Sequence, residues 1–350
     1  MNRPNSKSSP SGSRRGRTAT FVSDNFATVD PAVMAYLVNI NRGHTPGYGY
    51  DAVTRQAEEL VQKVFGSNTW VLFVPSGTGA NMLGLKLLLA RPYDAIVTPE
   101  SSHVFGEETG AAAANLGAHI YTVPQHDGKI YLNELRQVVD TWTAEGFHAP
   151  LPKVVSIANA TEFGTVYTPD EVRGIAEYCH EHDMYLHMDG CRLANAAVSL
   201  GMELDVLTAK AGVDVLSFGG AKNGLMSAEA VVVFNAPDTD LRRMQKQALQ
   251  LVSKMRFVSG QFVPYLQDER WRKNAATANR LARMLADGLG EGISRPVETN
   301  QVFCRLPSEV VGRIRAAGHD IYDWPTGEVR FVSSWDNTEE DVNALLRLIR

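Results

Sequence analysis

The chain of 350 residues has an ordinary globular composition, with 44% hydrophobic and 21% charged residues, and it is long enough for two domains. Its formal net charge is -5. Residues 1–20 carry five of the 34 basic residues and none of the 39 acidic ones. Residues 21–350 therefore contain 29 basic and 39 acidic residues and have a net charge of -10. A body of this charge repels phosphate backbones and argues against a nucleic-acid partner, and no apolar run reaches the length of a membrane span.

The amino-terminal segment, residues 1–20, is rich in Ser, Arg and Pro, a composition typical of a disordered tail. It has neither the apolar region of a secretion signal nor the clear apolar face of a transit peptide, so we expect the protein in the cytoplasm. The three cysteines, Cys179, Cys191 and Cys304, are widely spaced and odd in number, which argues against a disulfide framework. Neither they nor the nine histidines show a metal-binding spacing, and we predict no metal site.

From residue 21 onward, predicted helices and strands alternate along the chain. They are helix 31–40, helix 54–65, strand 69–74, a helix ending near 90, strand 94–97, a helix ending at 116, strand 119–123, helix 132–144, strand 153–158, helix 169–182, strand 185–189 and strand 213–218. Strands separated by helical segments of about 10–15 residues are typical of βαβ units. The predicted fold class is therefore α/β, with a mostly parallel central sheet that helices cover on both faces.

After strand 213–218 come strand 230–234, a charged helix from about residue 238 and a long amphipathic helix 264–289. Strand 301–306, helix 309–317, strand 329–333 and helix 339–348 then predict a smaller α/β unit. We expect a large domain over residues 21–260 and a small C-terminal domain over residues 261–350.

The turn after strand 69–74 has the composition of a phosphate-binding site. It reads Ser76-Gly77-Thr78 and leads into an apolar helix, whose free N–H groups and the Ser/Thr hydroxyls would face an anion. The turn is not a Walker loop and lacks the full Gly-x-Gly-x-x-Gly spacing. A Ser/Thr helix cap with nothing bound explains the same pattern equally well.

Two charged residues follow neighbouring predicted strands. Asp189 ends strand 185–189, and a carboxylate there can hold a protonated pyridine nitrogen or, alternatively, cap the next helix. Lys222 follows strand 213–218 in Gly-Gly-Ala-Lys-Asn-Gly, where small neighbours would let an aldehyde cofactor approach the amine. Taken alone, such a lysine is more often a solvated surface cation. Because ligands bind beyond the carboxyl ends of parallel strands, we expect the 76–78 turn, Asp189 and Lys222 to converge.

Four further features have both a functional and a structural interpretation. His103 precedes an apolar helix, where a satisfied polar residue is the simpler explanation. Arg192 can bind a carboxylate in fork geometry or form a structural ion pair. Arg330 interrupts an apolar strand, and a charge there needs a partner or a ligand. The glycine-punctuated loop 41–51 is either a surface loop or a contact to substrate or subunit.

Five motifs in this order resemble those of the L-threonine aldolases: Ser-Gly-Thr-Gly-Ala-Asn, Ser-His103-Val-Phe, His-Met-Asp189-Gly-Cys-Arg192-Leu-Ala-Asn-Ala, Gly-Gly-Ala-Lys222-Asn-Gly and Val-Arg330-Phe-Val-Ser. The resemblance covers the chain from about Phe21 to the C-terminus. It is greatest to the low-specificity and phenylserine aldolase branch of the fold-type-I pyridoxal-phosphate enzymes, in the β-eliminating lyase group.

The resemblance implies a role for each residue of the motifs. Lys222 would form the Schiff base, Asp189 would hold the pyridine nitrogen, and His103 would stack on the cofactor ring. Gly77 and Thr78, with Ser76, would hold the phosphate. The remaining implied residues are Ser23, Arg192 and Arg330 for the substrate carboxylate, and His148 for the substrate hydroxyl. Similar enzymes are homotetramers built from dimers with interfacial active sites, which would place loop residues 48–51 across the interface.

The implied reaction is the reversible retro-aldol cleavage of L-3-hydroxy-α-amino acids, such as L-threonine, L-allo-threonine or L-phenylserine, to glycine and an aldehyde. The base that takes the hydroxyl proton is open between His103, His148 and a water that they hold. The chain departs from the family at Ala221 and Asn223, where many members have Ser-Lys-Gly around the lysine, and at Ser333-Ser334, where Thr-His is usual. The alternatives are another fold-type-I lyase that catalyses β-elimination, a nucleotide-binding module, and a catalytically idle pyridoxal-phosphate carrier.

Overall fold

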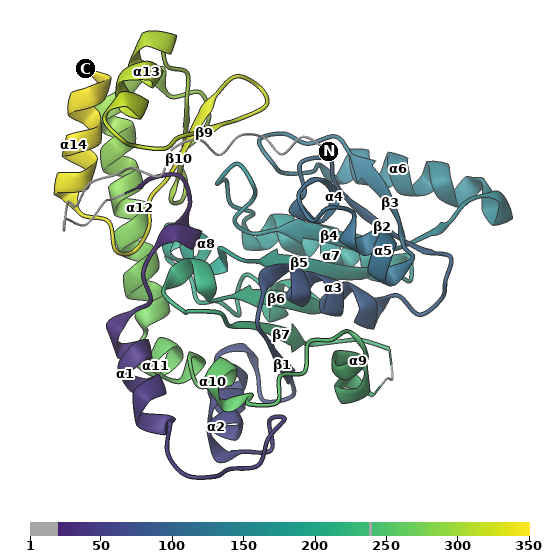
Figure 1. Ribbon diagram of the computed structural model, residues 1–350. Coiled ribbons are helices and arrows are strands. Elements are labelled where there is room, and N and C mark those ends of the chain that lie inside the picture. The colour runs from purple at the N-terminus through teal and green to yellow at the C-terminus, as the bar shows by residue number, and fades with distance from the viewer. Residues whose placement is uncertain (1–19, 238–239) are drawn as a thin grey trace, which may run out of the picture.

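A seven-stranded sheet forms the centre of the molecule (Figure 1), in a computed structural model that describes residues 20–237 and 240–350. The strand order is β1-β7-β6-β5-β4-β2-β3. The strands are β1 (Trp70–Val74), β2 (Asp94–Pro99), β3 (His119–Val123), β4 (Leu151–Ala158), β5 (Tyr185–Gly190), β6 (Val215–Gly219) and β7 (Glu229–Val233). Only β7 runs antiparallel to its neighbours, β1 and β6, so the predicted mostly parallel α/β sheet is confirmed.

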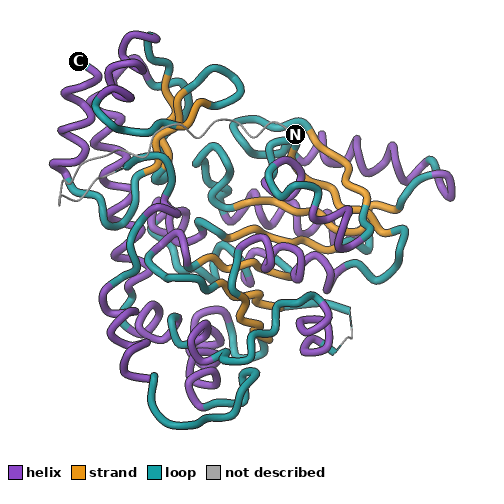
Figure 2. The backbone as a smooth tube through the Cα atoms, in the orientation of Figure 1, coloured by secondary structure: helices purple, strands orange, loops and turns teal. Residues whose placement is uncertain are grey.

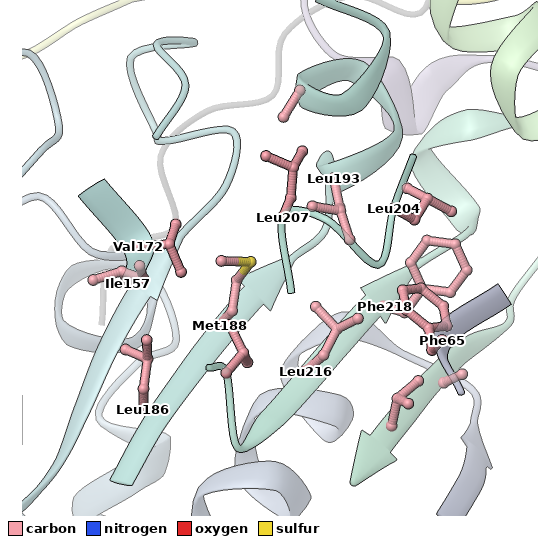
Figure 3. Close-up of a cluster of buried hydrophobic side chains, with 14 of the residues drawn as sticks. Phe65, Ile157, Val172, Leu186, Met188, Leu193, Leu204, Leu207, Leu216 and Phe218 are labelled. Atoms are coloured by element: carbon pink, nitrogen blue, oxygen red, sulfur yellow. The ribbon is translucent and has the colours of Figure 1, made fainter. Parts of the chain in front are cut away.

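Helices cover both faces of this sheet because its strands are apolar on both sides. In β1, Val71 and Phe73 pack in one core cluster and Leu72 and Val74 in another. The helices that pack in the first cluster are α2 (Ala52–Phe65), α6 (Leu132–Ala144), α7 (Pro169–Glu181) and α8 (Leu193–Leu200), and Figure 3 shows part of this cluster. On the opposite face lie α3 (Gly77–Leu88), α5 (Ala111–Leu116) and α9 (Leu241–Gln247).

Helix α3 lies close to the strands because of a glycine on its sheet-facing side. A Cβ added at Gly84 would lie 3.1 Å from Nε2 of His187 and 3.2 Å from the Val215 side chain. Those contacts are tighter than ordinary van der Waals contacts, so glycine at this position lets the helix approach the sheet. The approach fixes the position of the amino end of α3 relative to the ends of β5 and β6.

A second, three-stranded sheet lies apart from the first (Figure 2). Its order is β8-β10-β9, with β8 (Gln301–Cys304), β9 (Tyr322–Asp323) and β10 (Val329–Val332) all antiparallel. Its core is shared with α12 (Arg270–Leu289), α13 (Ser308–Ala316) and α14 (Glu339–Ile349). Phe21 also packs there, and its carbonyl accepts a hydrogen bond from the Val332 N–H. The N-terminal segment is thereby tied to the small sheet.

Short elements complete the described chain. They are α1 (Pro31–Ile40), α4 (His103–Gly106), α10 (Arg256–Ser259), α11 (Phe262–Gln267), and the 3-10 turns η1 (Asp24–Phe26), η2 (Gly146–His148), η3 (Ala209–Ala211), η4 (Ala221–Asn223) and η5 (Gly290–Gly292). Among the described residues, no helix combines the length and apolar character needed to cross a bilayer.

The structure corrects several predicted elements. The predicted helix 264–289 is two helices, α11 and α12, because Glu269 has a φ of +51° and interrupts the helical hydrogen bonding. Strand β9 was not predicted, since two residues are too short for a periodic pattern. The charged helix expected from about residue 238 is α9; residues 238 and 239, like the predicted tail before Thr20, lie outside the described residues.

Candidate active site

Most of the predicted site residues follow the carboxyl ends of sheet strands. Asp189 is the fifth residue of β5, and Lys222 lies in η4, just after β6. The 76–78 turn follows β1, and His103 begins α4 after β2. Strands β2, β4, β5 and β6 are parallel, so their carboxyl ends lie along one edge of the sheet. The fold therefore brings these predicted site residues to the same edge of the sheet.

The Asp189 carboxylate is buried and rigidly held. Only 6% of the residue is exposed; its Oδ1 accepts a hydrogen bond of 2.9 Å from the Cys191 N–H and its Oδ2 one of 2.8 Å from Asn81 Nδ2. Burial alone would raise the pKa of Asp189, but the charge of Lys222 and these hydrogen bonds lower it below its usual value. The group is thus a buried anion, as a partner for a protonated ring nitrogen must be.

Lys222 lies on a turn that its neighbours hold from several sides. A Cβ added at Gly219 would lie 2.5 Å from the Cα of Cys191, so only glycine fits there. Glu229 Oε2 accepts a hydrogen bond of 2.6 Å from the Gly220 N–H. On the other side of the lysine, Asn223 Nδ2 donates to the Tyr265 hydroxyl at 2.8 Å and to the Trp271 carbonyl at 2.9 Å. The turn is therefore fixed to β7, α11 and α12.

The charge of Lys222 links it to the acidic groups of the site. It lowers the pKa of Asp189 and contributes to lowering that of Asp24, in both cases against the effect of burial. It also opposes the burial that raises the pKa of Glu229 to about 7. One amine thus acts on carboxyls from three different segments, and the predicted Lys222–Asp189 pair lies in a single site.

The predicted phosphate turn has the expected local structure. Ser76 is the N-cap of α3, and its Oγ accepts from the Gly79 N–H at 3.1 Å. Ser76, Thr78 and Gly79 line a groove together with Gln250, whose buried Oε1 has no hydrogen-bond partner in the described part of the chain. A Cβ added at Gly77 would lie 3.3 Å from the Cys191 sulfur, so this turn also contacts the segment that follows Asp189.

His103 is connected to Asp189 through a hydrogen-bonded chain. Its Nδ1 lies 2.9 Å from Oε1 of Glu108, and this oxygen accepts a hydrogen bond of 3.0 Å from Asn81 Nδ2, which also donates to Asp189. The Glu108 hydrogen bond raises the pKa of His103 above its usual value, against the effect of burial. The His103 backbone N–H donates to Glu162 Oε1 at 2.9 Å. Both the imidazole and the backbone of His103 are thereby held.

The two predicted carboxylate-binding arginines differ in their pairing. Arg192 donates from Nε and Nη2 to the two oxygens of Asp24, at 2.7 and 2.9 Å, so the structural ion pair considered for it exists. The guanidinium of Arg330 forms no hydrogen bond or ion pair with any described residue, and its Nε is buried without such a partner. Arg192 is nonetheless close enough to contribute to lowering the pKa of Arg330. Ser23 adjoins Asp24 and caps η1, accepting from the Asn25 N–H at 3.2 Å.

His148 is the exception among the predicted site residues. It is exposed in η2, which precedes the amino end of β4, whereas Asp189 pairs with Ala158 at the carboxyl end of that strand. A strand of eight residues spans roughly 25 Å, so the two residues lie at opposite edges of the sheet. The chain does not bring His148 to its own site, and a contact with substrate would require a second subunit.

Sequence reasoning missed the acidic and amide residues that hold the predicted ones. Asp24 and Asn81 lie inside segments that were singled out, but nothing in the pattern indicated their partners. Glu108, Glu162 and Glu229 follow no recognisable motif. Burial raises the pKa of both Glu162 and Glu229 to about 7, against hydrogen bonds from backbone N–H groups.

The residues present fit pyridoxal phosphate. The amino end of a 12-residue helix offers free N–H groups to a phosphate, and Asp189 is a buried anion. Lys222 lies on a turn with three glycines, and the Arg330 guanidinium, which no described residue pairs with, can bind an anion. Among the described residues, no group of three or more His, Cys, Asp and Glu side chains is arranged to hold a metal ion.

Comparison with known proteins agrees with this geometry. A family model described as beta-eliminating lyase matches residues 20–308. The chain is 40% identical over 342 residues to a low specificity L-threonine aldolase of Pseudomonas aeruginosa, and the matched region covers 95% of this chain and 97% of the relative. It is 39% identical over 339 residues to a protein of the same description from Pseudomonas sp. strain NCIMB 10558, over 94% of this chain and 96% of the relative.

Among solved structures, a threonine aldolase of Leishmania major superposes with a TM-score of 0.88 at 28% identity. The match covers 95% of this chain and 100% of that one. The chain therefore belongs to the beta-eliminating lyase family of fold-type-I pyridoxal-phosphate enzymes and, within it, to the group of the low-specificity L-threonine aldolases.

Proposed function

We propose that this protein is a pyridoxal-phosphate-dependent aldehyde-lyase that cleaves L-3-hydroxy-α-amino acids reversibly to glycine and an aldehyde. The names of its two bacterial relatives support this reaction for threonine. The observation that carries the proposal within the structure is the electrostatic interaction of Lys222 with the buried carboxylate of Asp189 at one edge of the sheet. A pyridoxal-phosphate-dependent retro-aldol enzyme needs one amine to hold the aldehyde cofactor and one anion to keep the cofactor ring protonated.

The chain offers a place for each part of the cofactor. When bound, pyridoxal phosphate supplies an electron sink for the bond that breaks at the substrate Cα. We assign Lys222 to the cofactor aldehyde, Asp189 to the ring nitrogen and His103 to the ring face. Ser76, Gly77 and Thr78 would bind the phosphate through N–H groups and hydroxyls, which the free amino end of α3 supports.

Arg330, Arg192 and Ser23 would bind the substrate carboxylate. The two guanidinium groups lie close enough for their charges to interact, and Arg330 has no acceptor of its own among the described residues. A carboxylate between them would provide that acceptor. Fixing the carboxylate also fixes the direction of the breaking Cα–Cβ bond, and positioning of this kind can lower a barrier by about 7–11 kcal/mol.

We assign the proton transfer from the substrate hydroxyl to His103 or to a water that it holds. Its Nδ1 is hydrogen-bonded to Glu108, whereas its Nε2 lies 3.9 Å from Glu107 Oε2, beyond hydrogen-bond distance, and can bind a substrate or water. The raised pKa of His103 favours a group that holds a proton near neutral pH once it has accepted one. His148 of the same chain lies at the other edge of the sheet and is left out of this assignment.

The decisive experiment is a visible spectrum before and after borohydride reduction, followed by peptide mapping. Borohydride fixes the cofactor to the amine that holds it, so the label should map to Lys222. Lys222→Ala should abolish turnover in a folded protein. A label on another amine, or wild-type rates in the variant, would remove Lys222 from its role.

A second measurement separates aldol cleavage from the β-elimination that the family name describes. The enzyme is offered threonine and, separately, β-chloroalanine. Release of acetaldehyde from threonine supports the proposed reaction, whereas pyruvate from β-chloroalanine without any aldehyde from threonine would support an elimination enzyme.

We further propose that the protein is a homotetramer built from dimers. Exposed apolar side chains support this assembly, among them Val38 at 71% exposure, Tyr50 at 68% and Leu249 at 89%. A cytoplasmic location is supported by cysteines that are all free. The division into domains at residues 260/261 stays a prediction: α11 packs in the core of the large sheet, whereas the second half of α12 packs with the small sheet.

A further inference from the structure

Arg330 lies on the central strand of the small sheet, on the face away from the core. Its neighbours Val329 and Phe331 pack among the apolar residues of α12, α13 and α14. Since side chains alternate along a strand, Arg330 faces the other way. Its cross-strand partners are Phe303 on β8 and Tyr322 on β9, so aromatic residues flank it on both sides.

Two aromatic rings contact the guanidinium itself. Its central carbon lies 4.5 Å from the centroid of the Tyr322 ring and 5.1 Å from that of Trp324. No carboxylate among the described residues pairs with Arg330, and its Nε is buried without a partner. Burial and the neighbouring charge of Arg192 both lower the pKa of Arg330. Contact with these rings attracts the cation, in addition to the charges of Asp24 and Glu107, and partly offsets its burial and the repulsion from Arg192.

The Trp324 ring contacts aromatic rings from both the small sheet and the loop after β4. Its ring meets Phe303 edge to face, with centroids 5.2 Å apart, and lies 5.5 Å from the ring of Phe163. Phe163 belongs to the loop after β4 and follows Glu162, the residue that binds the backbone of His103. The rings around Arg330 therefore connect the small sheet to the loop that holds the candidate catalytic histidine.

We propose that Tyr322 and Trp324 form an aromatic clamp that positions Arg330 for the substrate carboxylate while leaving its hydrogen-bond donors free. The inference rests on the proposed function and deepens it. A carboxylate partner, such as Asp24 provides for Arg192, would neutralise the charge and occupy the N–H groups. A ring face attracts the cation without accepting the in-plane N–H groups, which remain available for bidentate binding. The two aromatic residues are positioning residues that act through Arg330.

The experiment compares two amines that differ in the carboxylate alone. Equilibrium binding of glycine and of ethanolamine to the holoenzyme is followed through the visible spectrum, in wild type, Trp324→Leu and Trp324→Phe. We expect Trp324→Leu to weaken glycine binding by about tenfold and to leave ethanolamine binding unchanged. Trp324→Phe, which keeps a ring, should retain most of the glycine affinity. With threonine, KM should rise while kcat changes less.

Tyr93→Leu is the matched control. Arg91 lies 5.1 Å from the Tyr93 ring, but this pair precedes the amino end of β2, at the opposite edge of the sheet. Its loss should leave the binding of both amines as in wild type. Tyr322→Leu serves as the second clamp variant if Trp324→Leu does not fold.

The proposal is overturned if glycine binding is unchanged in the folded clamp variants, or if glycine and ethanolamine weaken by the same factor. The second result would assign the rings a merely structural role. Failure of the proposed function is recognised separately, because wild-type enzyme would then release no aldehyde from threonine.

Discussion

Two partly buried arginines of this molecule lie close enough for their charges to interact, and they have different partners. Arg192, at the start of α8, is paired with both oxygens of Asp24; Arg330, on the small sheet, is contacted by aromatic rings. Burial would lower the pKa of Arg192, but Asp24 raises it above its usual value. Burial and the charge of Arg192 lower the pKa of Arg330; the charges of Asp24 and Glu107 offset this only in part, and no residue in the described part of the chain forms an ion pair with it.

The difference indicates that the two arginines contribute to different properties, one to the stability of the fold and the other to ligand binding. An arginine that is paired with a carboxylate of the same chain belongs to the folded structure, and removing the carboxylate lowers the free energy of unfolding. A charge that the chain leaves unpaired raises the free energy of the empty site and is compensated when an anion binds. Arg192 therefore belongs mainly to the architecture, and Arg330 mainly to recognition.

Removing Asp24 tests the architectural half of this comparison and should have the largest effect. Asp24→Ala leaves the Arg192 side chain without its partner and removes one of the two acceptors of Asn300 Nδ2. We expect the free energy of unfolding to fall by about 3–5 kcal/mol. Urea denaturation measures this change. A decrease in the free energy of unfolding below about 1 kcal/mol would mean that the Asp24–Arg192 pair contributes no more than an exposed surface ion pair.

Removing the Arg330 side chain tests the recognition half. Arg330→Ala should raise KM for threonine by a factor that corresponds to about 2–4 kcal/mol, because a desolvated carboxylate loses its partner. The free energy of unfolding should change little, since no described ion pair is broken. Steady-state kinetics and urea denaturation of the same variant give both numbers. An unchanged KM contradicts the assignment.

Glu229 extends the comparison from arginines to carboxyls. Asp24 is paired with an arginine and its pKa is lowered, whereas Glu229 is held by the Gly220 N–H and its burial raises its pKa from 4.5 to about 7. A raised pKa contributes stability that is present below pH 4.5 and is lost as the pH rises to about 7. That loss is on the order of 1–3 kcal/mol.

Glu229→Gln should therefore flatten the dependence of unfolding free energy on pH between about 4.5 and 7. Both proteins are measured without cofactor, so that cofactor binding does not contribute. Glu162 acts in the same direction, so part of the slope should remain in the variant. A slope identical to that of wild type would mean that Glu229 ionises normally in the folded protein.

The sequence predicted the layers of the fold and much of the site, for physical reasons that can be identified. Helical and strand periodicities alternate clearly, and parallel strands bring their carboxyl ends to one edge, so Asp189 and Lys222 could be placed together. The break at Glu269 was invisible because the apolar periodicity continues across it from α11 into α12. Strand β9 was too short to leave a pattern.

What could not be predicted depends on contacts between distant segments. Asp24 and Arg192 are 168 residues apart, and neither flanking sequence indicates the pairing. The roles of Tyr322 and Trp324 depend on the register of β9 against β10, which places Tyr322 opposite Arg330. His148 was assigned to the site through a motif match, but its segment enters β4 from the amino end.

The smallest expected effect comes from an ion pair at the surface. Arg272 and Glu203 lie 2.7 Å apart, the same distance as Arg192 Nε and Asp24 Oδ2, yet their side chains are 31% and 67% exposed against 11% and 1%. Glu203→Ala should reduce the free energy of unfolding by less than about 1 kcal/mol, and added salt should reduce this loss further. Urea denaturation at two salt concentrations measures both effects. If Glu203→Ala and Asp24→Ala reduce the free energy of unfolding by the same amount, burial does not strengthen an ion pair in this protein. The lack of an ion-pair partner for Arg330 among the described residues would then not indicate a role in binding.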